Sequence, residues 1–389
     1  MFNSIEVVTS RLLDYCRAND WAGYDPYDVL NSKILEHLSF FDSRISRLAL
    51  TQLMKRSPLN FRPLLRVPKT QNPKAIALFL MALLKLSSLG ILEEVDSVRQ
   101  MVEKLQVLRA EDAANRCWGY SFPWQTRAKI VPRGTPNLVC TVFVANALLN
   151  VYELNHDPYC LALALDASEF ILNELYWTQG DSSAGFSYPL PSIREQIHNA
   201  NFLGAAFLCR VYHFTGEKTL LGPALSVARS SASKQNDDGS WFYGESTKAR
   251  WIDNFHTGYN LLGLRDIKRY GETTEFDSQI QRGFEFYIKH FFREDGAVRY
   301  FHNKTYPIDI HCVAQSLITL LTFKDLDDNN LRLADRVFRW AIDHMWNDHG
   351  YFYYQIHPLY KNRISYMRWS QAWMLLALST VLEVLSQGN

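Results

Sequence analysis

Apolar residues in this chain gather in helix-length segments of two alternating kinds. One kind is apolar on nearly every face after a polar first turn, and the clearest examples begin near Pro136, His198, Asp253, Asp309 and Tyr366. The other kind is amphipathic and covers roughly 95–109, 158–176, 218–234, 277–293 and 329–347. A helix that is apolar all round is buried between other helices, whereas an amphipathic helix lies at the surface. We therefore expect an inner and an outer set of helices.

A glycine with an aromatic cluster precedes each inner segment, as in Gly239 to Tyr243, Gly296 to Tyr300 and Gly350 to Tyr353. The spacing of about 55 residues holds two helices, which is typical of a repeated helical hairpin. Residues 4–18 and 74–86 supply a sixth pair, with an insertion at about 28–70 between them. Six hairpins predict an all-α (α/α)6 toroid in which residues 1–389 form one domain. The outer-to-inner loops should then surround one end of a central cavity.

Composition narrows the possible functions. The net charge of +1 comes from 41 basic and 40 acidic residues, so the chain lacks the basic character of nucleic-acid-binding proteins. The six cysteines form no CxxC pair, which indicates reduced, buried thiols. We find no signal sequence, and the apolar run 75–84 is too short to span a bilayer. We expect a cytoplasmic protein with no transmembrane segment and no cofactor.

The strongest candidates for catalysis are two short motifs at the start of adjacent inner segments, Asp253 to His256 and Asp309 to His311. We interpret the two histidines as occupying equivalent positions, side by side in the cavity. A histidine oriented by a nearby carboxylate is suited to proton transfer. Two such bases favour proton abstraction next to a carboxylate, as in uronate epimerases and β-eliminating lyases. The expected auxiliary acids are Tyr259 and Tyr300.

Aromatic and basic side chains in the predicted loops are suited to a sugar ligand, because flat rings stack on pyranose faces and polar groups bind hydroxyls. Arginine pairs with carboxylate or phosphate groups, so the expected carbohydrate can be anionic or lipid-linked as well as neutral. The predicted arginine contacts are Arg127, Arg299 and Arg368. The other predicted contacts are Trp124, Trp241, Tyr353, Asn201 and Trp369.

Other interpretations remain open at this point. The histidines could bond only to neighbouring helices, Asp253 and Asp309 could serve as N-caps, and the aromatic rings could simply fill the end of the barrel. A glycoside hydrolase would need two carboxylates, for which Asp25 and Glu245 are further candidates. A zinc site at Asp309, His311 and Cys312 lacks a fourth ligand, so no metal is expected.

One further alternative is a terpenoid cyclase. Residues 235–241 fit a single copy of the Gln-to-Gly-x-Trp motif of such enzymes, and residues 325–328 spell an Asp-rich motif. The Asp-rich stretch, however, is predicted at the opposite end of the barrel. A non-catalytic saccharide-binding or scaffold protein is the remaining alternative. Oligomeric state cannot be deduced from these patterns.

Several sequence motifs, spread over roughly residues 110–380, resemble those of one protein family. They are 118–127, 134–137, 198–201, 251–259, 307–311 and 366–374. They are similar to the polysaccharide biosynthesis proteins encoded in bacterial exopolysaccharide, capsule and O-antigen gene clusters. The resemblance implies a part in making or modifying a surface polysaccharide, without specifying a reaction. At the level of fold, the chain is also similar to α/α-toroid epimerases, glycoside hydrolases and polysaccharide lyases.

Overall fold

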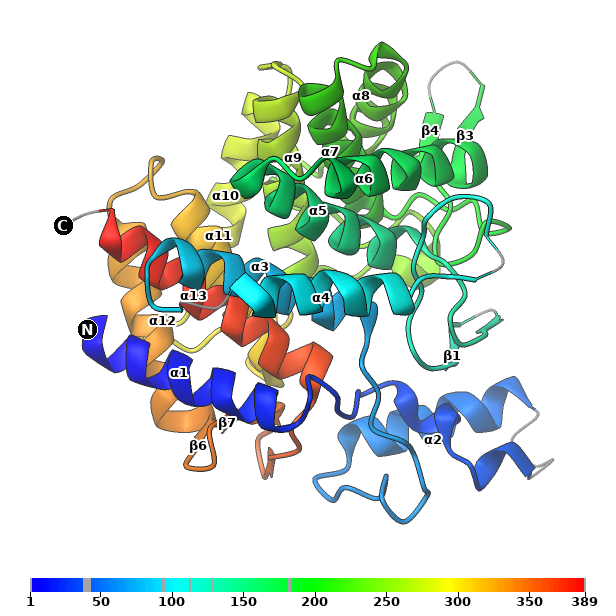
Figure 1. Cartoon of the computed structure of the whole chain (residues 1–389). Coiled ribbons are helices and arrows are strands. Elements are labelled where there is room, and N and C mark those ends of the chain that lie inside the picture. The colour runs from blue at the N-terminus through cyan, green and yellow to red at the C-terminus, as the bar shows by residue number, and fades with distance from the viewer. Residues whose placement is uncertain are drawn as a thin grey trace.

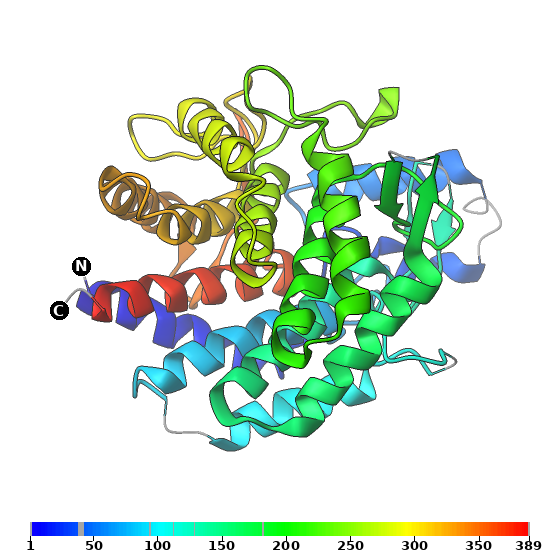
Figure 2. The ribbon, with the colours of Figure 1, turned by 90° about the horizontal axis from the view of Figure 1, so that it is seen from above.

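Six inner helices form a closed ring in the computed structural model, which describes residues 2–37, 43–92, 95–111, 113–127, 129–180 and 183–387. Each inner helix contacts the next, and the last one contacts the first (Figure 2). The inner helices are α3 (Pro73–Ser88), α5 (Leu138–Asn155), α7 (His198–Thr215), α9 (Asn254–Tyr270), α11 (Ile310–Thr322) and α13 (Ala372–Ser386). A π-helical turn, η6 (Met367–Gln371), continues directly into α13.

The outer helices each pack on the inner helix that precedes them, and the first one packs on α13. They are α1 (Phe2–Ala18), α4 (Val95–Val107), α6 (Pro158–Phe170), α8 (Lys218–Ala232), α10 (Asp277–Phe291) and α12 (Asn329–Met345). The contact of α1 with α13 brings the two ends of the chain together (Figures 1 and 2). The predicted all-α (α/α)6 toroid is therefore confirmed.

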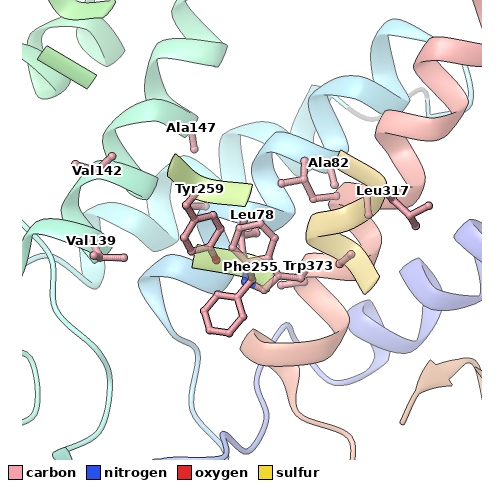
Figure 3. Close-up of a cluster of buried hydrophobic side chains, with 14 of the residues drawn as sticks. Leu78, Ala82, Val139, Val142, Ala147, Phe255, Tyr259, Leu317 and Trp373 are labelled. Atoms are coloured by element: carbon pink, nitrogen blue, oxygen red, sulfur yellow. The ribbon is translucent and has the colours of Figure 1, made fainter. Parts of the chain in front are cut away.

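The core lies where the inner helices meet. Figure 3 shows Leu78 of α3, Tyr259 of α9 and Trp373 of α13 close together at the centre, and all three are buried. Burying a leucine or valine side chain stabilises the fold by about 1.5–3 kcal/mol. The apolar character of the inner segments is thus explained by contact with neighbours on every side.

Helix α5 has the length and hydropathy of a membrane span, and it is the one described helix that does. It packs between α3 and α7 in the ring, and 61% of it is buried inside the protein. Its composition therefore matches its place among the inner helices. All six cysteines are free and buried, as predicted.

Short antiparallel strands close the loops at one end of the ring. The pairs are β1 (Trp124–Gln125) with β2 (Ile130–Val131), β3 (Tyr176–Gln179) with β4 (Ser183–Phe186), and β6 (Trp346–Asn347) with β7 (Tyr351–Phe352). A three-stranded sheet joins two repeats in the order β5 (Ile308–Asp309), β8 (Gln355–Ile356) and β9 (Lys361–Asn362).

At three of the repeated glycine positions the backbone conformation favours glycine. Gly239, Gly296 and Gly350 have φ values of +89°, +91° and +86°. A Cβ atom on Gly296 would lie 2.5 Å from the carbonyl oxygen of Arg336, and one on Gly239 would lie 2.3 Å from that of Arg282. The turn at the end of an outer helix therefore lies directly against the next outer helix.

The N-terminal insertion lies between α1 and α3. It contains η1 (Asp28–Asn31), η2 (Leu35–His37) and α2 (Arg44–Arg56), with a small apolar cluster of its own. Fully buried Arg62 joins it to the ring, because its guanidinium contacts Asp28 at 2.5 Å and donates to the Tyr366 hydroxyl at 2.9 Å. Helix α2 lies near β1, beside the loop end of the toroid (Figure 1).

Candidate functional site

A cavity of about 950 Å³ opens at the loop end, and one equivalent position of every repeat forms its floor. The second residue of each of the segments α3, α5, α7, α9, α11 and η6 lines it. In ring order these floor residues are Lys74, Val139, Asn199, Phe255, His311 and Arg368. The six-fold repeat thus places one side chain per hairpin at the bottom of the cavity.

Asp253 and His256 form a hydrogen-bonded pair on the cavity wall. Asp253 precedes α9, and its Oδ1 caps the helix by accepting from the His256 backbone N–H at 3.0 Å. Its Oδ2 lies 2.7 Å from His256 Nδ1 and also accepts from Trp251 Nε1 at 2.8 Å. The His256 side chain is 20% exposed, and its Nε2 has no hydrogen-bond partner in the described part of the chain. One carboxylate therefore both starts the helix and orients the imidazole.

His311 lies on the floor, paired with Tyr259 of α9. Its Nε2 is 2.7 Å from the Tyr259 hydroxyl, and both residues are buried. The imidazole stacks between Phe255 and Trp373, with ring centroids 4.6 Å apart on each side. Burial lowers the pKa of His311 well below its usual value, and nearby Lys74 adds to this effect, so the imidazole is neutral. Burial raises the pKa of Tyr259. The His311–Tyr259 pair can therefore donate a hydrogen bond to a ligand, or accept one from it, while both side chains are uncharged.

The two histidines are not structurally equivalent, contrary to the sequence interpretation. His256 is the third residue of α9, whereas His311 is the second residue of α11. The residue equivalent to His311 is Phe255, which stacks on it. Asp309 also differs from Asp253 in its side-chain contacts. It caps α11 through the His311 backbone N–H at 2.8 Å, but it does not contact the imidazole.

Asp309 orients a tryptophan instead. Its carboxylate accepts from Trp369 Nε1 at 3.0 Å and from Gln355 Nε2 at 2.5 Å. Burial raises the pKa of Asp309 to about 6, while these hydrogen bonds act in the opposite direction. Asp309 is fully buried and does not line the cavity, but Trp369 and Gln355 both do.

Several predicted contacts lie on the cavity wall. Tyr300 and Trp124 line it, and the indole Nε1 of Trp124 is buried without a hydrogen-bond partner. Arg127 also lines it, with its guanidinium 4.6 Å from the ring centroid of Trp251. Arg368 lies on the floor but already has a partner, because its Nε and Nη2 bond to the Asp25 carboxylate at 2.7 and 2.9 Å.

Four predicted contacts lie elsewhere. Trp241 is buried in the core and donates to the Ser231 carbonyl. Asn201 is also buried, where it bonds to the Phe186 backbone N–H and the Ser231 hydroxyl. Arg299 donates to the His290 carbonyl, and Tyr353 packs beside the core. None of the four lines the cavity. Their spacing alone did not distinguish structural aromatic and polar residues from cavity-facing ones.

The cavity is more basic than the predicted arginine contacts implied. Among the described residues, its lining holds seven Lys and Arg side chains and one carboxylate, that of Asp253. Five of these cations lie toward the mouth and form no ion pair with a described carboxylate: Lys55, Arg56, Arg127, Arg250 and Lys304. Lys55 and Arg56 belong to α2 of the insertion, so no repeat pattern could have assigned them to the cavity. Trp251 was also missed, although it stacks on Tyr243 beside His256.

The remaining sequence hypotheses fit this geometry less well. Asp25 and Asp309 are both engaged inside the protein, and Glu245 bonds to His198 at 2.9 Å, so no second carboxylate among the described residues faces Asp253 across the cavity. The Asp-rich stretch 325–328 lies in the loop between α11 and α12, away from the cavity. No group of three or more His, Cys, Asp or Glu side chains in the described ranges could hold a metal ion.

No protein-family model and no curated protein matches the sequence. Solved structures do match it. A cellobiose 2-epimerase from Spirochaeta thermophila has 14% identity and a TM-score of 0.59, over 82% of this chain and 87% of that one. A GH76 α-mannanase from Bacteroides thetaiotaomicron has 12% identity and a TM-score of 0.61, over 83% and 89%. A possible GH105 member from Salmonella enterica has 13% identity and a TM-score of 0.59, over 93% and 100%. At these identities the similarity identifies the fold.

Proposed function

We propose that this protein is a carbohydrate-active enzyme that transfers protons to and from a sugar in the central cavity. The observation that carries this proposal is the His256–Asp253 pair. Because the carboxylate occupies Nδ1, the neutral imidazole keeps its basic lone pair on Nε2, the nitrogen without a protein partner. Asp253 would also stabilise the imidazolium after proton transfer, as a carboxylate does in a catalytic triad.

The expected reaction is abstraction of a proton from carbon next to a carbonyl or carboxylate group. His256 would accept the proton, and the neutral His311–Tyr259 pair would donate to, or accept from, the opposite side of the sugar. Return of the proton to the other face gives an epimer, and loss of a leaving group gives an unsaturated product. A two-carboxylate hydrolase is less well supported, because Asp253 is the one carboxylate in the described lining.

The charge of the cavity favours an anionic carbohydrate. Five unpaired cations toward the mouth can bind carboxylate or phosphate groups, including a lipid-linked pyrophosphate. Together with the motif resemblance, this supports a cytoplasmic step in the making or modification of a bacterial surface polysaccharide. Tyr243, Trp251 and Trp369 supply aromatic faces for sugar rings.

The test is incubation with uronate-containing and neutral oligosaccharides in heavy water, followed by mass spectrometry. Deuterium uptake or an unsaturated product is expected with the native enzyme. His256→Ala should lower the rate at least about 100-fold, the typical contribution of a general base. His213→Ala, at an exposed position on α7, is the matched control. Products that have gained water would instead indicate a hydrolase, and binding without reaction would indicate a saccharide-binding protein.

A further inference from the structure

Lys74 is a buried lysine with no acidic partner among the described residues. It is the second residue of α3, is 3% exposed and lines the cavity floor. Its Nζ faces rings from three different helices, with centroids at 4.0 Å for Phe143, 5.3 Å for Trp373 and 5.5 Å for Tyr259. No described carboxylate forms an ion pair with it. The sequence interpretation had treated this lysine only as the start of an inner helix.

Such an ammonium group is poorly stabilised while the cavity holds no ligand. Removing a charge from water costs several kcal/mol, and each aromatic face returns about 0.5–2 kcal/mol. Burial lowers the pKa of Lys74 well below its usual value, and nearby Arg368 adds to this effect, so the protein alone disfavours the ammonium form and an anionic ligand would favour it. An anionic group brought by a ligand would supply the missing partner.

The surrounding floor is arranged to accept an anion at this position. Arg368, the other floor cation, is neutralised by Asp25 at 2.7 Å. The N-terminal ends of α3 and α5 are capped by the neutral side chains of Asn72 and Asn137, whereas α9 and α11 begin at aspartates. Helix N-termini favour negative charge, and here two of them remain uncompensated next to Lys74.

Lys74 and the proposed base both lie beside the ring of Tyr259. Its Nζ lies 5.5 Å from the centroid of the Tyr259 ring, and the His256 ring centroid lies 6.1 Å from that same ring. We propose that Lys74 binds the carboxylate of a uronic acid residue, so that the C–H beside this carboxylate faces His256. This inference rests on the proposed function and deepens it by naming hexuronates as the substrate class.

The proton and electrons balance within this arrangement. His256 Nε2 takes the proton from the carbon, and the C–H electron pair forms a carbon–carbon double bond to the carboxylate carbon. The additional negative charge moves onto the carboxylate oxygens, where the Lys74 ammonium stabilises it. Collapse of this intermediate either recovers a C–H bond with a proton from Tyr259, or expels the leaving group on the next carbon, which departs as an alcohol with the proton that His256 took up.

Calorimetric titration at constant ionic strength tests the binding step, with D-glucuronate, D-glucose and inorganic phosphate as ligands. We expect the native protein to prefer glucuronate over glucose by at least about 10-fold, equivalent to about 1.4 kcal/mol. Lys74→Met should abolish this preference and leave glucose affinity within about 3-fold, or about 0.7 kcal/mol. Lys85→Met removes the same charge at the far end of the same helix and should preserve the preference. Equal binding of both sugars, or a preference retained in Lys74→Met, would overturn the proposal.

Further measurements separate the possible explanations. Phosphate that binds as tightly as glucuronate, with the same dependence on Lys74, would indicate a site for a free anion and overturn the assignment to a sugar carboxylate. Thermal unfolding should show that Lys74→Met and Lys74→Gln fold normally, since removing an unpaired buried charge does not weaken packing. A Lys74-dependent preference without deuterium uptake would support this site while refuting the proposed reaction. Deuterium uptake on neutral sugars that does not change in Lys74→Met would support the proposed reaction while refuting this site.

Discussion

At the scale of single residues, Asp253 has two functions that ordinarily fall to different side chains. One oxygen caps α9, and the other orients His256 while also accepting from Trp251. The cap fixes the start of the helix, so the imidazole is oriented by the same carboxylate that secures the local fold. This arrangement makes it possible to separate the structural and chemical effects of one carboxylate.

Asp253→Asn should keep the cap and lose control of the imidazole, because an amide oxygen still accepts from a backbone N–H but no longer stabilises an imidazolium. We expect the proton-exchange rate to fall by about 100-fold or more and the free energy of unfolding to change by about 1 kcal/mol or less. Asp157→Asn, at the N-cap of the outer helix α6, is the matched control and should leave exchange unchanged. Equal exchange rates for native protein and Asp253→Asn would contradict the assignment.

His311 should make stability dependent on pH. Burial holds its pKa well below that of a histidine in the unfolded chain, about 6.5. The unfolded chain therefore binds a proton that the folded protein does not, and stability is lost as pH falls below about 6.5. Urea unfolding at pH 7.5 and 5.5 should show a loss for the native protein that exceeds that for His311→Gln by about 1 kcal/mol. The exposed His213→Gln should behave like the native protein, and an equal loss in all three would exclude this linkage.

At the scale of elements, the repeated glycine is the part of the pattern with the clearest physical cause. Gly239, Gly296 and Gly350 share both a positive φ and contact with a carbonyl of the next outer helix. The glycines at 119 and 185 have no positive φ, so the repeat in sequence combines two different structural requirements.

Gly296→Ala should be strongly destabilising, because the new Cβ meets both an unfavourable φ of +91° and backbone atoms at 2.5 Å. We expect a loss of about 3 kcal/mol from the sum of strain and overpacking. Gly216→Ala is the matched control, since its φ is +71° and nothing lies within 4 Å of the new Cβ, so it should cost about 1 kcal/mol. Chemical denaturation measures both, and equal losses would show that the contact with Arg336 is unimportant.

Element patterns also explain which parts of the site were predictable. Helix periodicity determines the ring, because each inner helix must be buried on every face. It also places the segments beginning at Asp253 and Asp309 at the cavity. It does not resolve a shift of one residue, so Phe255 rather than His256 matches His311. Side-chain direction in the loops depends on individual turns, which is why Trp124 reaches the cavity and Trp241 does not.

At the scale of the whole molecule, charge is distributed very unevenly. The chain as a whole carries a net charge of +1, yet its cavity gathers seven cations around one carboxylate. Two of them, Lys55 and Arg56, come from the insertion, and Lys74 comes from the first inner helix after it. Total composition conceals this feature, because acidic residues outnumber basic ones in the rest of the chain.

Binding of an acidic oligosaccharide should therefore weaken with salt. Raising ionic strength from 0.1 to 1 M shortens the Debye length from about 10 Å to about 3 Å. We expect affinity for an oligouronate to fall at least about 10-fold over this range, because four of the five cations toward the mouth are exposed and become screened. Affinity for a neutral oligosaccharide of equal length should change less than about 2-fold. Titration calorimetry at both salt concentrations decides the matter, and parallel behaviour of the two ligands would argue against an electrostatic contribution.

The floor of the cavity has an evolutionary consequence. Its six positions share one backbone environment but hold lysine, valine, asparagine, phenylalanine, histidine and arginine. The second position of a helix requires no capping side chain, so the start of each inner helix does not determine which residue stands there. Descendants of such a chain can exchange them one at a time, each substitution altering which sugar is recognised while the barrel stays intact. A closed ring of repeats thus allows new specificities to arise by single mutations without first acquiring a new fold.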